Sequence, residues 1–212
     1  KAKKIEVRLS VKENDFIEWF PASLKEPTTD QVDFLREKVN KTYQGKLPIA
    51  VIGIGGGSTM DVAKALSVLL CNEGSSTKYQ GWDLVKNPGI YKIGIPTLSG
   101  TGAEASRTCV MTNTDSGLKL GMNSDFTIYD QLILDPDLTK TVPKEQYFFS
   151  GMDTYIHCIE SINGNYRNAI GDAFEALGST FAPAVIAFAK GVKMLAEGVN
   201  ALLDFTQNYH GV

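Results

Sequence analysis

The chain pairs a carboxylate with an imidazole at Asp153 and His157, four positions apart in the segment 151–160. If this segment is helical, the two side chains stand one turn apart on the same face. An aspartate and a histidine held in this way can close on one divalent metal ion. The alternative is a solvated helical pair with no ligand, and the spacing alone favours that alternative. The chain has one other histidine, His210, which Gly211 follows.

A glycine-rich segment upstream favours the interpretation that the chain has a ligand-binding site. Gly55, Gly56 and Gly57 follow an apolar run, and Ser58 then leads into a helical pattern. Glycines let the backbone approach a ligand closely, and the free amides at a helix start favour negative charge. The segment is neither the G-x-G-x-x-G fingerprint nor a P-loop. A bare glycine turn is the alternative, but the strand-to-helix context favours a cradle for a pyrophosphate.

A second segment of this kind follows the apolar run 91–96. It offers three hydroxyl side chains and two glycines before a helix start, namely Thr97, Ser99, Thr101, Gly100 and Gly102. Two such loops at the carboxyl ends of neighbouring parallel strands would line the crevice where open α/β sheets bind nucleotides.

These segments need a framework of strands and helices to position them. The patterns predict strands at 16–20, 49–54, 91–96 and 127–136, and helices at 31–42, 59–70 and 100–106. In the helix 59–70, the inward face would carry Val62, Ala65, Leu66 and Leu69. Strands that alternate with helices imply a parallel α/β sheet. From Lys144 onward the pattern is helical, so we place a domain boundary near residue 143.

Composition excludes several classes of protein. A net charge of −3 and the absence of a large basic cluster argue against nucleic-acid binding. Three scattered cysteines fit reduced thiols better than a disulfide framework. The longest apolar run, residues 181–189, is too short to span a bilayer and contains a proline. We therefore expect a soluble cytoplasmic protein that does not bind membranes.

Three motifs occur in the order Gly-Gly-Gly-Ser-x-x-Asp, Pro-Thr-x-x-Gly-Thr-Gly-x-Glu and Gly-Met-Asp-x-x-x-His-x-x-Glu. In this order they resemble the iron-containing (group III) alcohol dehydrogenases. That family has the dehydroquinate-synthase-like architecture, an α/β nucleotide-binding domain with a parallel sheet followed by an all-α metal-binding domain. The segments around the motifs are more similar to one branch, the 3-deoxy-D-manno-octulosonate (Kdo) 8-oxidases. This closer resemblance lies in the segments 53–65, 72–76, 79–84, 121–125 and 155–158.

The resemblance implies a role for each residue that matches a motif. The residues that would hold the pyrophosphate of a dinucleotide are Gly56, Gly57 and Ser58, with Asp61 close by. The residues that would line the nicotinamide and ribose are Thr97, Ser99 and Thr101, with Lys119 near the ribose. The metal-binding and catalytic residues would be Asp153, His157 and His210, the last from a His-Gly pair.

The sequence departs from the family pattern in its outer parts. The family's first strand and turn precede the point that matches Lys1, and further helices follow the point that matches Val212. The chain also lacks a histidine between His157 and His210, where the family supplies another ligand. We therefore expect a truncated member, with residues 1–143 as a dinucleotide-binding domain lacking its first strand and residues 144–212 as an incomplete helical metal-binding domain.

The reaction implied by the resemblance is oxidation of a primary alcohol to an aldehyde, at the C8 hydroxyl of Kdo, on the way to an 8-amino sugar of lipopolysaccharide. A bound Fe²⁺ or Zn²⁺ would lower the pKa of the substrate hydroxyl, and NAD(P)⁺ would take the hydride, with O₂ as an alternative acceptor. The resemblance also implies a homodimer acting on a small sugar acid or alcohol. Two other interpretations stay open: another NAD(P)-dependent polyol or alcohol dehydrogenase of the family, and a catalytically silent nucleotide-binding fragment.

Overall fold

The structure is a computed structural model that describes residues 17–20 and 26–163 of the 212-residue chain. His210 and the apolar run 181–189 lie outside the described residues. The chain divides into two compact units, Lys1–Thr154 and Tyr155–Val212. The two sheets and both glycine-rich segments belong to the first unit.

The first unit contains a parallel sheet. Its strands are β1 (Ala50–Gly55), β3 (Tyr91–Pro96) and β6 (Gln131–Leu132), in the order β1-β3-β6. The register pairs Gly55 with Pro96, so β1 and β3 end side by side. This confirms the predicted parallel arrangement of the two apolar runs, and it brings the segments that follow them to the same edge.

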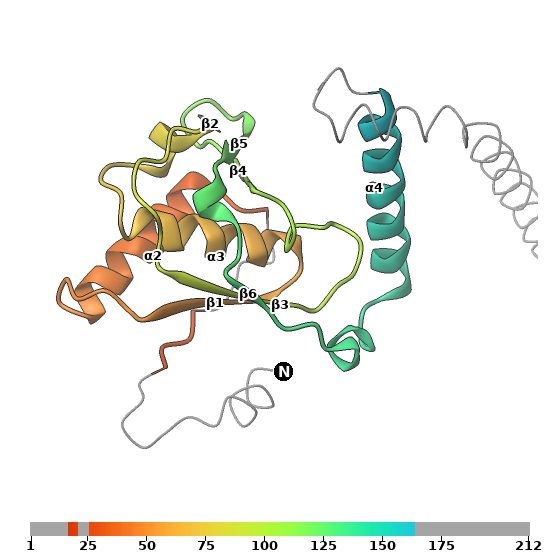
Figure 1. Cartoon of the computed structure of the whole chain (residues 1–212), viewed down its shortest axis with the longest axis horizontal. Coiled ribbons are helices and arrows are strands. Elements are labelled where there is room, and N and C mark those ends of the chain that lie inside the picture. The colour runs from red at the N-terminus through yellow and green to blue at the C-terminus, as the bar shows by residue number, and fades with distance from the viewer. Residues whose placement is uncertain (1–16, 21–25, 164–212) are drawn as a thin grey trace, which may run out of the picture. The chain divides into compact units, whose positions relative to one another are not determined.

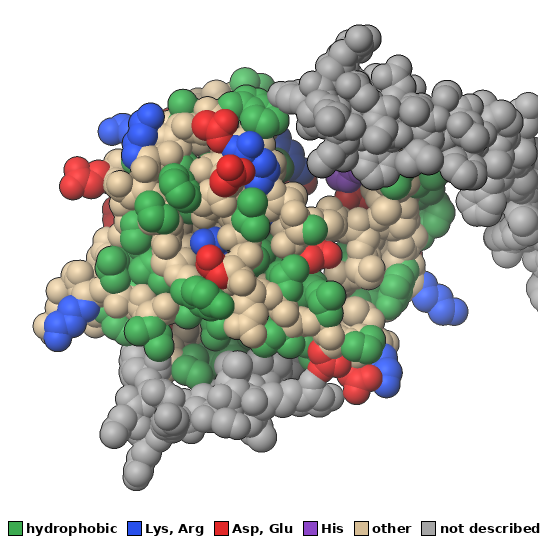
Figure 2. All heavy atoms as spheres, in the orientation of Figure 1, with side chains coloured by type: hydrophobic (Ala, Val, Ile, Leu, Met, Phe, Trp, Pro, Cys, Tyr) green, Lys and Arg blue, Asp and Glu red, His purple; other side chains and the backbone are tan. Residues whose placement is uncertain are grey.

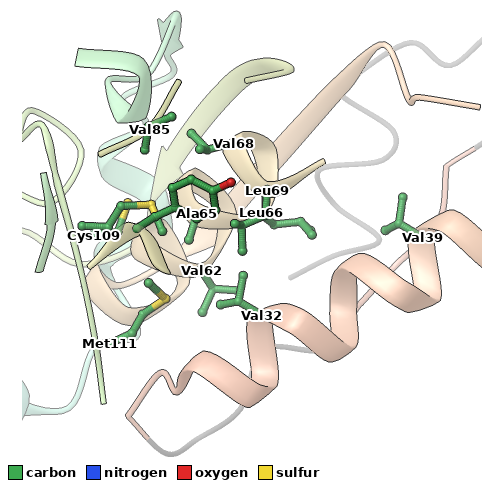
Figure 3. Packing of buried hydrophobic residues seen from close by; sticks show 12 residues of the cluster. Val32, Val39, Val62, Ala65, Leu66, Val68, Leu69, Val85, Cys109 and Met111 are labelled. Carbon is green, nitrogen blue, oxygen red and sulfur yellow. The ribbon is translucent and has the colours of Figure 1, made fainter. Parts of the chain in front are cut away.

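Two helices supply most of the apolar packing. Helix α2 (Thr29–Thr42) begins at Thr28, whose hydroxyl oxygen accepts a hydrogen bond from the amide of Gln31 at 3.2 Å. Helix α3 (Gly57–Leu69) buries the four residues predicted for its inward face, and Figure 3 shows Val32 of α2 beside Val62 of α3. Helix α3 contacts both β1 and β4, and it lies between the two sheets in Figure 1.

A second, mixed sheet was not predicted. Its strands are β2 (Gly81–Trp82), β5 (Lys119–Asn123) and β4 (Thr108–Thr112), with β4 and β5 antiparallel and β2 parallel to β5. No strand was predicted from the sequence in these three segments, whereas the predicted parallel sheet is present as β1, β3 and β6. The hairpin of β4 and β5 was not predicted because its strands are short and each buries only one or two side chains. The buried side chains are Cys109, Met111 and Met122.

Three further predictions of local structure need correction. The segment 100–106 is a series of turns because Gly100 and Gly102 have φ angles of +135° and +64°, which a right-handed helix does not use. The segment 127–136 contains only the two-residue β6, between the 3-10 helices η2 (Asp125–Thr127) and η3 (Pro136–Thr139). Residues 17–20 form no strand. A further 3-10 helix, η1, covers Ser76–Tyr79.

Helix α4 (Lys144–Asn163) begins where the sequence pattern becomes helical. It contains the whole segment 151–160, so the helical form on which the Asp153–His157 pairing depends is confirmed. Across the described ranges, the search for a bilayer-spanning helix found none with enough length and apolarity.

Candidate functional site

The first glycine loop, residues 55–58, joins β1 to α3. Gly56 precedes the first helical residue, Gly57, and it has no side chain with which to cap the amides of the first turn. Those amides are among the backbone donors that a helix start leaves without helical partners. The Ser58 side chain is exposed at the same turn. Together these groups form a positively polarised end of α3 that suits a phosphate.

The second glycine loop, residues 97–106, lies directly beside the first. The amide of Thr97 donates a hydrogen bond to the carbonyl oxygen of Gly55 at 2.8 Å. A β-carbon on Gly57 would lie 3.0 Å from Oγ1 of Thr101, and one on Gly56 would lie 3.5 Å from the Leu98 side chain. The two loops are thus neighbours at the carboxyl ends of β1 and β3, as predicted.

The second glycine loop also packs against the beginning of α4. A β-carbon on Gly100 would lie 2.6 Å from Cβ of Ser150 and 2.7 Å from its carbonyl oxygen. The hydroxyl of Thr154 donates to the carbonyl oxygens of Gly100 and Ser150. The residue next to Asp153 is therefore hydrogen-bonded to the loop that also touches the start of α3.

Asp61 has a structural role that the sequence did not reveal. Its carboxylate accepts a hydrogen bond from the amide of Val110 at 3.0 Å and lies 3.4 Å from Nζ of Lys64. Burial raises the pKa of this carboxyl above its ordinary value, and the charge of Lys64 opposes that shift. Asp61 thus joins α3 to β4 of the mixed sheet, one turn after the first glycine loop.

Lys119 lies on β5, where its ammonium group is 2.9 Å from Oε1 of Glu26. Among the described residues, no hydrogen bond connects Lys119 with either glycine loop. The structure therefore brings together Gly56, Gly57, Thr97 and Thr101, but it does not join Lys119 to them.

Lys64 was not predicted from the sequence as part of the site. This lysine has no exposed surface, and it hydrogen-bonds to the end of the second glycine loop. The signal that could have revealed it is a lysine in the apolar run of α3, between two alanines. A charge at a position that packing should bury indicates a polar partner nearby.

The candidate metal ligands are covered only in part. Asp153 and His157 are four positions apart in the continuous helix α4, a spacing that places two donors on one side of a helix. An oxygen and a nitrogen donor suit Fe²⁺ or Zn²⁺. Within the described residues, no group of three His, Cys, Asp or Glu side chains converges as a metal site. The third candidate, His210, lies outside them, so a complete ligand set stays a prediction.

Charged side chains of both signs lie on the surface of the described residues. On the face drawn in Figure 2, basic side chains of the described residues stand singly or beside acidic ones. The described residues include the ion pairs Arg107–Asp125 and Lys140–Asp137. A continuous basic surface, which nucleic acid would require, is not seen on this face of the described part.

Comparisons with known proteins agree with this arrangement. A sequence model described as "Iron-containing alcohol dehydrogenase" matches residues 2–136. The chain is 38% identical over 159 residues to the sulfoacetaldehyde reductase of Bilophila wadsworthia, covering 74% of this chain and 40% of that protein. It is 31% identical over 155 residues to the NAD-dependent methanol dehydrogenase of Bacillus methanolicus, covering 73% of this chain and 40% of that protein. The chain thus spans well under half the length of these relatives.

Solved structures show the same fold. An iron-containing alcohol dehydrogenase from Thermotoga maritima superimposes with a TM-score of 0.67 at 28% identity, over 81% of this chain and 45% of the other. Sulfoacetaldehyde reductase from Bifidobacterium kashiwanohense, solved in complex with NAD⁺, gives a TM-score of 0.64 at 27% identity, over 76% of this chain and 42% of the other. The match of the family model over most of the chain, together with these similarities, shows that the chain belongs to the iron-containing alcohol dehydrogenase family.

Proposed function

We propose that this chain supplies the dinucleotide site, and part of the metal site, of an enzyme that interconverts a primary alcohol and an aldehyde. The observation that carries the proposal is the contact between the two glycine loops at Gly57 and Thr101. Both loops end neighbouring parallel strands, and such an edge is where α/β sheets bind nucleotides.

The residues present fit NAD(P). The amides at the start of α3 and the exposed hydroxyl of Ser58 would bind the pyrophosphate. The hydroxyls of Thr97, Ser99 and Thr101 would hold the ribose and nicotinamide side. Sulfoacetaldehyde reductase from Bifidobacterium kashiwanohense, which shares this fold, was solved with NAD⁺. Asp61 and Lys119 would act indirectly, Asp61 by fixing α3 and Lys119 as a charge on β5.

Asp153 and His157 would hold a divalent metal ion, with His210 as a third ligand. The name of the family favours Fe²⁺ over Zn²⁺. When bound, the metal ion would acidify the substrate hydroxyl and nicotinamide would accept the hydride. Asp153 and His157 would orient that hydroxyl by fixing the metal from one side of α4. O₂ is the alternative acceptor, and a homodimer is the expected assembly.

For the substrate we retain the C8 hydroxyl of Kdo, on the similarity of the segments 72–76, 79–84 and 121–125 to Kdo 8-oxidases. The 38% identity to a sulfoacetaldehyde reductase supports a second candidate, a short aldehyde that bears an anionic group. Both substrates are anionic, but they differ greatly in size and in the distance between the charge and the reacting carbon. Activity assays can therefore separate them.

The test uses the full-length protein purified with its metal. We expect a near-stoichiometric metal content, saturable NADH binding, and loss of metal in the double variant Asp153→Ala His157→Ala with NADH binding retained. Kdo with NAD⁺, Kdo with O₂, and sulfoacetaldehyde with NADH are then assayed in parallel. NADH binding without metal or turnover would leave a silent nucleotide-binding protein, and the absence of NADH binding would overturn the whole proposal.

A further inference from the structure

Lys64 is fully buried in α3, in the second turn after the first glycine loop. A lysine is almost never fully buried unless its charge is paired, because removing an ammonium group from water costs several kcal/mol. The side chain therefore requires a dense set of partners. Its position, shared with Gly57 on one helix, makes those partners relevant to the dinucleotide site.

The hydrogen-bond partners of Lys64 lie in the segment 103–108, and Asp61 of α3 adds an ion pair. Its ammonium group donates to the carbonyl oxygens of Thr108 at 2.6 Å, Ala103 at 2.7 Å and Ser106 at 3.2 Å. The hydroxyl of Ser106 lies 3.1 Å away, and the carboxylate of Asp61 lies 3.4 Å away. An ammonium group has three protons to donate. Two carbonyl groups at the end of the second glycine loop, Ala103 and Ser106, and one at the start of β4, Thr108, therefore occupy its whole hydrogen-bonding capacity.

The second glycine loop needs such an anchor. Residues 97–106 form neither helix nor strand, so the carbonyl groups at the loop's end have no ladder to pair with. Gly100 and Gly102 both have positive φ. Because glycine populates positive and negative φ about equally, the backbone of an unanchored loop could adopt many other conformations. The ammonium group of Lys64 supplies the donors that a neighbouring strand would otherwise provide. Lys64 lies on α3, the helix whose first turn contacts Thr101.

We propose that Lys64 is a positioning residue for the cofactor: it fixes the second glycine loop against the start of α3 and thereby sets the affinity for the dinucleotide. This inference rests on the proposed dinucleotide site. Lys64 itself does not touch the cofactor, because its ammonium group is enclosed by its loop partners and Asp61. Its effect passes through the loop, whose Thr97 and Thr101 stand beside the first glycine loop.

The test compares four variants of the full-length protein. Lys64→Met alone would leave Asp61 as an unpaired buried carboxylate, so the main variant is Asp61→Asn Lys64→Met. Its reference is Asp61→Asn, which keeps the lysine and an acceptor for the Val110 amide. Ser106→Ala removes one partner and is the milder second variant. Ser67→Ala is the control, because it deletes a buried hydrogen bond from the same helix to Ile90, away from the loop.

Two measurements are made well below each melting temperature: amide hydrogen exchange in residues 97–108, and the dissociation constant for NADH. In Asp61→Asn Lys64→Met we expect faster amide exchange in residues 97–108 than in Asp61→Asn, and the same exchange rates in β1. We also expect a dissociation constant raised by about tenfold or more, as when the competent loop arrangement falls to roughly a tenth of the population. Ser106→Ala should shift both measurements in the same direction, and Ser67→Ala should lower only the melting temperature.

The inference would be overturned if the amide-exchange rate of the loop in Asp61→Asn Lys64→Met equalled that in Asp61→Asn. It would also be overturned if exchange were faster but the NADH affinity were unchanged. If the double variant does not fold, the same criteria apply to Ser106→Ala against the wild type. If the wild-type protein binds no NADH, the proposed function fails and the link to affinity fails with it. The exchange measurement then still decides whether Lys64 fixes the loop.

Discussion

Gly57 and Thr101 are in contact across the two glycine loops, and a β-carbon on Gly57 would lie 3.0 Å from Oγ1 of Thr101 and 3.2 Å from its Cβ. Real β-carbons rarely approach other atoms this closely, so a residue larger than glycine at position 57 would have to displace the Thr101 side chain. The two loops therefore act as one surface, and a change in either displaces the other.

The first prediction concerns Gly57→Ala. The added methyl group should displace Thr101 by a few tenths of an ångström and weaken NADH binding by about tenfold, because small misplacements of binding groups are costly. Alanine suits the first turn of a helix better than glycine does, so the melting temperature should change little. Fluorescence titration with NADH measures the first effect and thermal unfolding the second. Wild-type affinity in this variant would contradict the role of the contact.

The second prediction concerns Gly100→Ala, with Gly102→Ala as its matched control. Both glycines have positive φ, but only Gly100 lacks room, since its β-carbon would meet the Ser150 backbone. At Gly102 nothing lies within 4 Å. We expect Gly102→Ala to cost about 1–2 kcal/mol from its left-handed backbone alone, and Gly100→Ala to cost about 3 kcal/mol or more from strain and collision together. Urea unfolding of both variants measures the difference, and equal costs would mean that Ser150 does not restrict the loop.

The third prediction is a stabilising change. Gly151 lies inside α4, and a β-carbon there would meet nothing within 4 Å. Gly151→Ala should therefore raise the free energy of unfolding by about 0.5–1 kcal/mol, because glycine loses more backbone entropy in a helix than alanine does. Thermal unfolding gives the result. The metal content should be unchanged, since the substitution leaves Asp153 and His157 intact. A lower melting temperature would contradict the prediction, because it would show that another part of the protein packs against position 151.

The parts of the fold that could be predicted are those fixed by local signals. The apolar run of β1 is bounded by Pro48 and glycines, and α2 begins at a threonine that can cap it. Both signals lie within a few residues of the element that they define. The adjacency of the two glycine loops was also predictable, because the strands that precede them both read as buried and parallel.

The parts that could not be predicted depend on distant partners. Strands β4 and β5 are stabilised by pairing such as Cys109 with Met122, which no short window contains. The segment 100–106 contains good helix formers, but Gly100 and Gly102 have positive φ, and Gly100 packs against Ser150, which is 50 residues away in the sequence. Lys64 was not predicted for the same reason. The sequence places a lysine in an apolar run, but it does not show the carbonyl groups that surround the side chain.

The last prediction concerns unfolding at alkaline pH. Burial raises the pKa of the Cys109 thiol from 9.0 to about 12, and burial also raises the pKa of Tyr129. Because the unfolded chain releases the Cys109 proton near pH 9 and the folded chain keeps it, stability falls as pH rises through this window.

Between pH 8 and pH 10 the Cys109 contribution should amount to about 1.4 kcal/mol. Cys109→Ala should lower stability at pH 8 through lost packing, but its stability should then fall less steeply with pH than that of the wild type. Met111→Ala, which also removes a buried side chain from β4 but no titrating group, should keep the wild-type slope. Urea unfolding at pH 8, 9 and 10 measures all three slopes. Equal slopes for wild type and Cys109→Ala would show that this thiol ionises as readily in the folded protein as in the unfolded chain.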